Sequence, residues 1–374
     1  MKSPFRFSTS IIAFVAGLGL SLASAATATP RHTAVSIVGD NFLINGEPTF
    51  KGRSWRGHRI EGLLPNSRMV QGIFDDLNPD TRDQWAYPDT GKWDPERNTN
   101  EFIAAMLSWR AHGLLGFTLN LQGGSPLGYG NKGWINSAFQ DDGTLRPDYF
   151  ARLERILDRA DELGMVPILG LFYFGQDQNL HDEAAVLRAT DLTLEWLFDR
   201  GYRNILIEVC NESTETNYDH AVLRQPGVPA LIRRIAQTTR DGHRFPVTVS
   251  MSGGQLPTPE IVAASDFILI HGNNRRGVET TPDRIREMVA ETRVLPTWRE
   301  MPVVFNEDDH YDFDQPDNNF IAATESRASW GYFDFRRKED PFSEGFQSVP
   351  VDWSIESPRK KAFFTLLRQI TGAK

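Results

Sequence analysis

The sequence predicts an α/β protein with a (β/α)8 TIM barrel fold, a short N-terminal β-hairpin and a long loop after strand one. Apolar strand-like runs alternate with amphipathic helix-like runs from residue 49 to the C-terminus, which is the order of α/β folds. The candidate strands number eight, the count that closes a barrel. No glycine-rich dinucleotide motif follows the first strand, which favours the barrel over a doubly wound open sheet.

The candidate strands are short and mostly aliphatic. Two stretches, Ile205–Val209 and Phe267–Ile270, are nearly continuous apolar runs, as expected for parallel strands covered on both faces. In chain order the candidates are Thr49–Trp55, Gly116–Leu121, Val166–Tyr173, Asn204–Cys210, Pro246–Met251, Phe267–His271, Pro302–Phe305 and Trp330–Phe333. A barrel built from them would bring their C-terminal ends to one common face.

Helix candidates between the strands have apolar residues at three- and four-residue spacing. The pattern is clearest in Phe102, Met106 and Trp109, and in Tyr149, Leu153, Ile156, Leu157 and Ala160. A last helix is expected over Arg359–Ile370. Gly113, Gly164 and Gly201 follow helical patterns at positions where a left-handed residue ends a helix.

Two further segments flank the first strand. Asn41–Phe50 contains an Asn-Gly turn between apolar residues, which predicts a tight hairpin that caps the barrel floor. The longest connection runs from Gly57 to about Asn100 and carries Trp85, Tyr87 and Trp93. A loop of this length is usually functional, so we expect it on the catalytic face.

The N-terminus has the order of a secretory signal peptide. Basic residues are followed by the apolar run Ile11–Leu22 and the small residues Ala23-Ser24-Ala25. That run is shorter than the ~20 residues needed to span a bilayer, although a retained anchor is the alternative. We expect residues 1–25 to be removed, leaving residues 26–374 as one secreted or periplasmic barrel with no membrane partner.

Composition excludes several kinds of partner. The net charge is −9 and no long run of Lys or Arg occurs, which argues against nucleic acid and anionic lipid. Cys210 is the only cysteine, so no internal disulfide can form, and its apolar surroundings predict a buried structural thiol. Nothing in the sequence indicates an oligomeric state.

Two glutamates follow predicted strands and carry the functional hypothesis. The fourth strand ends at Asn211-Glu212 and the seventh at Asn306-Glu307. Hydrolysis of an acetal needs one carboxylic acid to protonate the departing oxygen and one carboxylate to meet the charge at the anomeric carbon. The sequence therefore predicts a glycosidase site, with the Asn211 amide available to a sugar hydroxyl.

The chain resembles the clan A glycoside hydrolases, the (β/α)8 group that includes many cellulases, mannanases and β-galactosidases. The resemblance covers residues 42 to 371. It implies that Glu212 is the acid/base and Glu307 the nucleophile of a retaining hydrolase acting on a β-linked oligo- or polysaccharide. It implies a carbohydrate substrate and no cofactor.

Other strand ends match the clan in part. Trp330 resembles the strand-eight tryptophan that floors the sugar subsite, and His271 resembles the strand-six histidine. Asn273 stands where many members have a tyrosine that touches the nucleophile. Strand two ends at Asn120 where many members have an arginine, so Arg53 is expected to supply that charge. Aromatic residues that could stack on sugar rings are Trp55, Trp85, Trp93, Trp134 and Tyr173.

Alternatives remain open for the same residues. Asn211 and Glu212 could be a helix N-cap followed by an acid in the first turn. The acidic residues from Glu307 to Asp317 could bind one structural Ca²⁺, although their spacing does not match an EF-hand, and no metal is expected in the catalytic site. A noncatalytic carbohydrate-binding barrel, or a transglycosylase using the same residues, could carry the same pattern.

Overall fold

The computed structural model describes residue 1, residue 4 and residues 31–129, 133–274, 277 and 279–374. The predicted signal peptide, residues 1–25, lies outside the described residues except for Met1 and Pro4. None of the described helices has the length and apolarity needed to cross a membrane.

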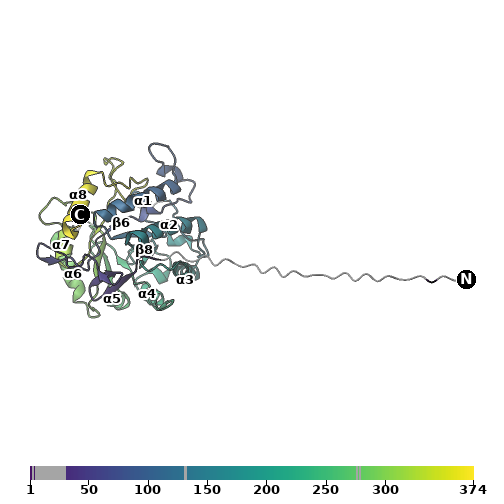
Figure 1. Ribbon diagram of the computed structural model, residues 1–374, viewed down its shortest axis with the longest axis horizontal. Helices are drawn as coiled ribbons and strands as arrows, with labels where there is room; N and C mark the ends of the chain where they lie inside the picture. The colour runs from purple at the N-terminus through teal and green to yellow at the C-terminus, as the bar shows by residue number, and fades with distance from the viewer. Residues whose placement is uncertain (2–3, 5–30, 130–132, 275–276, 278) are drawn as a thin grey trace.

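The prediction of a barrel is confirmed, with helices arranged around a ring of parallel strands (Figure 1). The strands are β6 (Asn66–Arg68), β7 (Gly116–Asn120), β8 (Val166–Phe172), β9 (Leu206–Cys210), β10 (Val247–Thr248), β11 (Ser250–Met251), β12 (Ile268–His271), β13 (Val303–Glu307) and β14 (Gly331–Tyr332). The pair β10 and β11 is one strand interrupted at Val249. Parallel pairing runs from β6 round to β13, bridges at Val304–Ser329 and Asp308–Tyr332 reach β14, and β14 pairs with β6.

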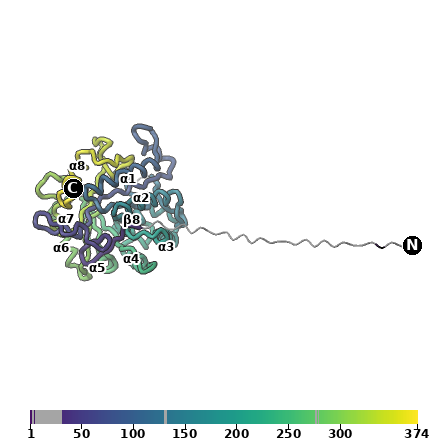
Figure 2. Tube along the Cα trace, viewed as in Figure 1, coloured from purple at the N-terminus to yellow at the C-terminus, as the bar shows by residue number. Residues whose placement is uncertain are grey.

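The surrounding helices follow the strands in alternation, as the tube in Figure 2 traces. They are α1 (Pro95–Ala111), α2 (Pro147–Leu163), α3 (Glu183–Asp199), α4 (Val228–Gln237), α5 (Pro259–Ala264), α6 (Pro282–Arg293), α7 (Asn319–Glu325) and α8 (Pro358–Thr371). The predicted apolar positions of α1 and α2 are all buried. The predicted glycines have positive φ angles, namely Gly113 (93°), Gly164 (67°) and Gly201 (70°).

The prediction that Thr49–Trp55 forms the first barrel strand was wrong. Ser54–Trp55 (β4) pairs only with His58–Arg59 (β5), in a small antiparallel hairpin. The barrel strand is β6, which lies inside the stretch that we predicted to be loop. Its three residues Asn66, Ser67 and Arg68 are polar yet buried. Asn66 and Arg68 point into the barrel, whereas Ser67, in register with Tyr332 and Phe117, points outward to the surrounding helices. A polar strand of three residues lacks the apolar run that identified the other strands.

The predicted N-terminal hairpin is confirmed. Strands β1 (Val35–Val38), β2 (Asn41–Ile44) and β3 (Glu47–Pro48) form an antiparallel sheet, with Asn45 and Gly46 both at positive φ in the turn. The Phe42 ring lies edge-on to Phe267, 5.9 Å between centroids. Phe42 also shares an apolar cluster with residues at the start of several barrel strands. The hairpin therefore seals the floor, opposite the end that carries Glu212 and Glu307.

The long loop after strand one is shorter than predicted because β6 interrupts it. Its remaining part, from Met69 to Asp94, buries Trp85 and Tyr87. Trp85 and Trp93 belong to an aromatic cluster with Tyr173, which follows β8 at the C-terminal face. The predicted position of this loop on that face is therefore confirmed. Cys210 is fully buried, as predicted, and burial raises the pKa of its thiol.

Lys360 on α8 offers a test of how this fold depends on pH. Its Nζ donates to the carbonyl oxygens of Ser343 at 2.7 Å and Asp352 at 2.6 Å, and burial lowers its pKa to about 8. An unfolded lysine keeps its proton to about pH 10.4, so between these values the unfolded chain binds more protons. The folded state should gain stability as pH rises through this window.

We therefore expect the difference in unfolding free energy between wild type and Lys360→Met to shift in favour of wild type by about 2 kcal/mol from pH 7 to pH 10. Urea unfolding of both proteins at the two pH values measures it. The comparison cancels other groups that titrate in this range. A difference that stays constant with pH would contradict the assignment.

Candidate active site

Glu307 ends β13, and its carboxylate is bound by Arg68 of β6 and by Asn273, which follows β12. Its Oε2 lies 2.8 Å from Arg68 Nε, and its Oε1 accepts a 2.7 Å hydrogen bond from Asn273 Nδ2. Burial alone would raise the pKa of this carboxyl, but the positive charge of Arg68, together with His271 and the Asn273 amide, outweighs burial and lowers it. Glu307 is therefore a fixed, ionised carboxylate.

Glu212 follows β9 in an unusual backbone conformation. Its φ is +51°, in the left-handed region that non-glycine residues rarely adopt. The backbone N–H of Glu212 donates to Ser250 Oγ at 2.8 Å, which ties this turn to the next strand. The predicted alternative of a helix N-cap does not apply here, because no helix begins at Asn211. Strained residues of this kind gather at functional sites.

His271, at the end of β12, joins the two glutamates. Its Nδ1 lies 2.9 Å from Glu212 Oε1 and 3.6 Å from Glu307 Oε2. One carboxylate oxygen of each glutamate and this nitrogen all lie within 4.8 Å of one another. Burial would lower the pKa of His271, but the neighbouring carboxyl groups of Glu307 and Glu212 raise it overall. The predicted pair therefore does meet at one mouth of the barrel.

Several other predicted residues lie beside the pair. Asn211 Oδ1 accepts a 3.0 Å hydrogen bond from Arg68 Nη2, and Asn273 contacts Glu307 directly. Tyr173 bonds Ser125 Oγ at 3.0 Å, and its ring stacks on Phe174. Asn120 lies farther from the two glutamates. Its side-chain amide bonds the backbone of Gln122 and Phe172.

Three predicted residues are not in the site, and these expectations need correction. Arg53 donates to the carbonyl oxygens of Gln369 and Ile370 at the C-terminal end of α8. Trp55 lies in the β4–β5 hairpin beneath the Arg56 guanidinium, 4.3 Å from its ring centroid. Trp330 is fully buried among aromatic rings of the helix layer: Phe313, Phe320 and Phe363. It faces away from the barrel axis because the next residue, Gly331, occupies the inner face.

Arg68 and Tyr129 belong to the site but were missed. Arg68 supplies the charge that we assigned to Arg53, and a structureless connection of more than 40 residues was the signal that a strand lay hidden there. Tyr129 follows β7, with its hydroxyl accepting from Asn273 Nδ2 at 3.0 Å and donating to Asp309 Oδ2 at 3.1 Å. Its ring is half exposed and packs edge-on to Phe333 and Phe335. No local sequence pattern predicts the contact between Tyr129 and Asn273.

Within the part of the chain that the structure describes, two side-chain clusters have ligand types suited to a cation. The first is Glu212, His271 and Glu307, where the Arg68 guanidinium already supplies a positive charge. The second is Asp308, Asp309 and His310. Asp308 Oδ2 already accepts hydrogen bonds from Trp330 Nε1 and Asn319 Nδ2, and its Oδ1 accepts from the backbone of His310. Protein donors thus engage both oxygens of Asp308.

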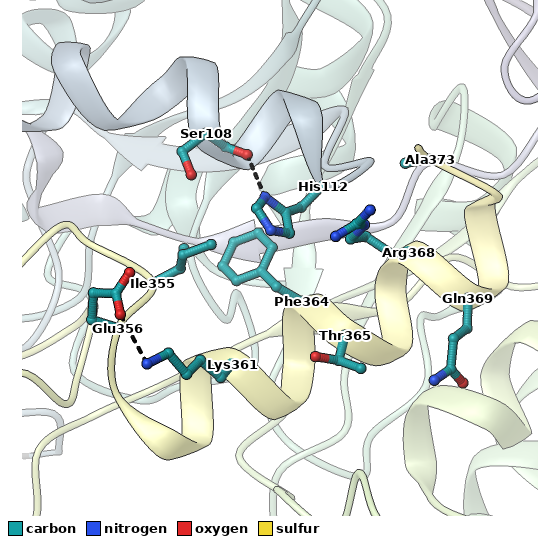
Figure 3. A pocket seen from close by; sticks show the side chains of 10 residues that line it. All are labelled: Ser108, His112, Ile355, Glu356, Lys361, Phe364, Thr365, Arg368, Gln369 and Ala373. Atoms are coloured by element: carbon teal, nitrogen blue, oxygen red, sulfur yellow. Dashed lines mark hydrogen bonds and ion pairs between the residues drawn. The ribbon is translucent and has the colours of Figure 1, made fainter.

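A cavity of about 650 Å³ lies elsewhere, on the outer side of the barrel between α1 and α8 (Figure 3). Its lining includes Ser108 and His112 from the α1 side and Phe364 and Arg368 from α8. None of the residues around Glu212 and Glu307 contributes to it. This cavity is therefore separate from the candidate site.

Comparisons with known proteins connect this architecture to solved structures. No family profile and no curated protein matches the sequence. A candidate glycoside hydrolase from Bacteroides vulgatus aligns with a TM-score of 0.53 and 12% identity over 88% of this chain, which spans 59% of that one. A broad-specificity GH5-4 endoglucanase from Bacteroides salanitronis gives a TM-score of 0.52 and 10% identity, covering 83% of this chain and 93% of that one.

A glycoside hydrolase family 5 mannosidase from Rhizomucor miehei, in a mutant form, gives a TM-score of 0.53 and 12% identity, covering 91% of this chain and 98% of that one. At such identities the likeness shows a shared barrel fold. It does not by itself establish what this chain acts on, because one barrel fold supports many chemistries.

Proposed function

We propose that this protein is a retaining glycoside hydrolase that cleaves a β-linked oligo- or polysaccharide. The observation that carries the proposal is the placement of two carboxyl groups, Glu212 and Glu307, around the single nitrogen His271 Nδ1 at the barrel mouth. Acetal cleavage without a cofactor requires a pair of this kind. The sugar-degrading enzymes of the same fold named above support the substrate class.

The environments of the two groups support different roles. Arg68 and Asn273 hold Glu307 as a carboxylate, which suits a nucleophile that attacks the anomeric carbon. Among the described residues, His271 is the titratable group at hydrogen-bond distance from the Glu212 carboxyl, whose side chain is 14% exposed. It can protonate the departing oxygen, and then take a proton from the water that releases the sugar.

The spacing of the carboxyl groups supports retention of configuration. One oxygen of Glu212 and one of Glu307 lie within 4.8 Å of each other, which is compatible with carboxyl groups as close as those of retaining enzymes. Retaining enzymes hold the two carboxyl groups ~5–5.5 Å apart, whereas inverting enzymes leave ~6.5–9.5 Å for a water molecule. In the retaining course, Glu307 forms a covalent glycosyl ester as the glycosidic bond breaks. Water then cleaves that ester, with Glu212 as the base.

A substrate screen tests the proposal directly. The purified protein should cleave at least one β-linked polysaccharide or aryl β-glycoside, with the β-anomer as the first product seen by NMR. A sugar acceptor replacing water would identify a transglycosylase that uses the same residues. If the wild type cleaves no glycoside but binds a glycan, the protein is a carbohydrate-binding barrel and the proposal is wrong.

Tyr129 should support the nucleophile without being essential. Replacing Tyr129 by Phe removes the acceptor for the second amide hydrogen of Asn273, so Asn273 should hold Glu307 less firmly. We expect kcat/KM to fall about five-fold, the equivalent of one hydrogen bond of about 1 kcal/mol. Tyr202→Phe is the matched control, because Tyr202 bonds Asp158 away from the site. Unchanged kcat/KM in Tyr129→Phe would contradict this role.

We also propose that the protein is exported, on the strength of the N-terminal sequence. The mature chain should begin near Ala26, after the small residues that end the signal segment. Mass spectrometry of the secreted or periplasmic protein measures this. A soluble cytoplasmic protein that retains Met1 would contradict export.

A further inference from the structure

The side-chain amide of Asn273 is held through its nitrogen, by contacts on two sides. Nδ2 donates to Glu307 Oε1 at 2.7 Å and to the hydroxyl oxygen of Tyr129 at 3.0 Å. The side chain is buried, and its Oδ1 has no hydrogen-bond partner among the described residues. The direction in which this amide faces therefore decides whether Glu307 receives a hydrogen bond from it.

An asparagine amide can face a neighbour with its nitrogen or, after a half turn, with its oxygen. The Glu307 carboxylate can only accept hydrogen bonds, so it is stabilised by the nitrogen and repelled by the oxygen. Tyr129 does not discriminate by itself, because a hydroxyl can accept from the nitrogen or donate to the oxygen. A hydroxyl that donated to Asn273 would favour the orientation that takes the nitrogen away from Glu307.

Asp309 determines which of these roles the Tyr129 hydroxyl takes. Tyr129 donates to Asp309 Oδ2 at 3.1 Å, so its oxygen is left to accept from Asn273 Nδ2. Burial of the hydroxyl and the negative charge of Asp309 raise the pKa of Tyr129, so the phenol keeps the proton that it donates. Burial and Asp308 raise the pKa of Asp309 as well, yet even a protonated carboxyl keeps an oxygen that can accept.

The backbone holds Asp309 in place for this contact. Asp308 forms a parallel bridge with Tyr332, and its carbonyl oxygen accepts from the backbone N–H of Phe333 at 3.0 Å. Asp309 is the next residue and is partly buried. Its Oδ1 has no hydrogen-bond partner among the described residues, so within this part of the chain Tyr129 supplies the hydrogen bond to the Asp309 carboxyl.

We propose that Asp309 is a positioning residue for the nucleophile. By accepting the hydroxyl hydrogen of Tyr129, it directs the Tyr129 oxygen toward Asn273. Asn273 is thereby kept with its nitrogen on Glu307. Hydrogen bonds of 3.1, 3.0 and 2.7 Å connect the two carboxyl groups in this order, and no proton is transferred along them. The effect on catalysis rests on the proposed function.

Two variants separate the charge of Asp309 from its capacity to accept. Asp309→Asn and Asp309→Leu keep nearly the native size and remove the same charge, but only leucine cannot accept a hydrogen bond. In Asp309→Leu the Asn273 nitrogen should stabilise the Glu307 carboxylate less, which raises the pKa of Glu307. ¹³C NMR of the substrate-free protein, assigned with Glu307→Gln, should find the Glu307 midpoint about half a unit higher in Asp309→Leu than in Asp309→Asn.

The same two variants in a Tyr129→Phe background provide the control. Without the hydroxyl, residue 309 has no hydrogen-bond route to Asn273, so the two Glu307 midpoints should coincide. Equal midpoints in the presence of Tyr129, or a difference that persists in its absence, would overturn the proposal. Asp309→Ala also lacks the acceptor and replaces Asp309→Leu if that protein does not fold. Because no substrate is used, the result is separate from whether the protein hydrolyses a glycoside.

Activity gives a second readout, on a substrate that the wild type cleaves. Asp309→Leu should have a kcat/KM about five-fold below that of Asp309→Asn, the effect of one hydrogen bond. The acid limb of its kcat/KM–pH profile, which reports ionisation of Glu307, should lie at higher pH. In the Tyr129→Phe background, the two variants should have equal kcat/KM, because both act through the missing hydroxyl. A five-fold difference that persists there, or an acid limb that does not move, would indicate a purely structural effect and overturn the proposal.

Discussion

Replacing Glu307 by Gln should reduce kcat/KM for the best substrate by at least ~10⁴-fold, because the amide cannot form the glycosyl ester. The amide keeps the size of the side chain and still offers one oxygen to Arg68 or Asn273, so the site should stay assembled. Steady-state kinetics on an aryl β-glycoside measures the loss. Mass spectrometry after reaction with a 2-fluoro glycoside should find a covalent adduct on Glu307 in wild type and none in the variant.

The matched control is Glu300→Gln, which makes the same chemical change at an exposed position beside Gly39 on the barrel floor. It should keep wild-type activity. Calorimetric titration with a sugar product should show that Glu307→Gln still binds, since other side chains of the mouth remain. If Glu307→Gln keeps more than a tenth of the activity, the nucleophile lies elsewhere, and Glu212 and Glu307 are not the catalytic pair.

Replacing Glu212 by Ala should have the second largest effect, and the effect should depend on the leaving group. Substrates with poor leaving groups need the proton from Glu212, so their kcat/KM should fall ~10²–10⁴-fold. Activated aryl glycosides leave without help, so their first step should be nearly unaffected. Glycosyl ester should then accumulate on Glu307, because water lacks its base. Burst kinetics with a nitrophenyl glycoside would reveal that accumulation.

Azide provides the decisive control for this role. A small anion can enter the space vacated by the Glu212 side chain and attack the anomeric carbon of the ester without a base. Turnover of the activated substrate should rise with azide concentration and yield a β-glycosyl azide. Glu212→Gln fills that space and should respond less. A lack of rescue in Glu212→Ala, or an α-configured azide product, would count against Glu212 as acid/base of a retaining enzyme.

The sequence by itself determined most of the architecture. Buried parallel strands such as Val166–Phe172 consist of apolar runs, and helices such as Pro147–Leu163 repeat apolar residues with helical spacing. Both kinds of element can therefore be recognised from the local sequence. Glu212 and Glu307 lie at the ends of strands that are apolar in this way. Because the C-terminal ends of barrel strands share one face, the order of the residues is enough to predict that these two glutamates lie on it.

The tertiary structure decided what surrounds that pair. Strand β6 is short and polar, with Asn66 and Arg68 turned into the barrel interior, so Arg68 could not be recognised and Arg53 was chosen instead. Trp330 was misplaced because successive strand residues point to opposite faces, and Gly331 takes the inner one. Local sequence determines which segments become strands. Register and packing among segments far apart in the chain decide which face each side chain takes. They also decide which loop residues contact the site, as Tyr129 contacts Asn273.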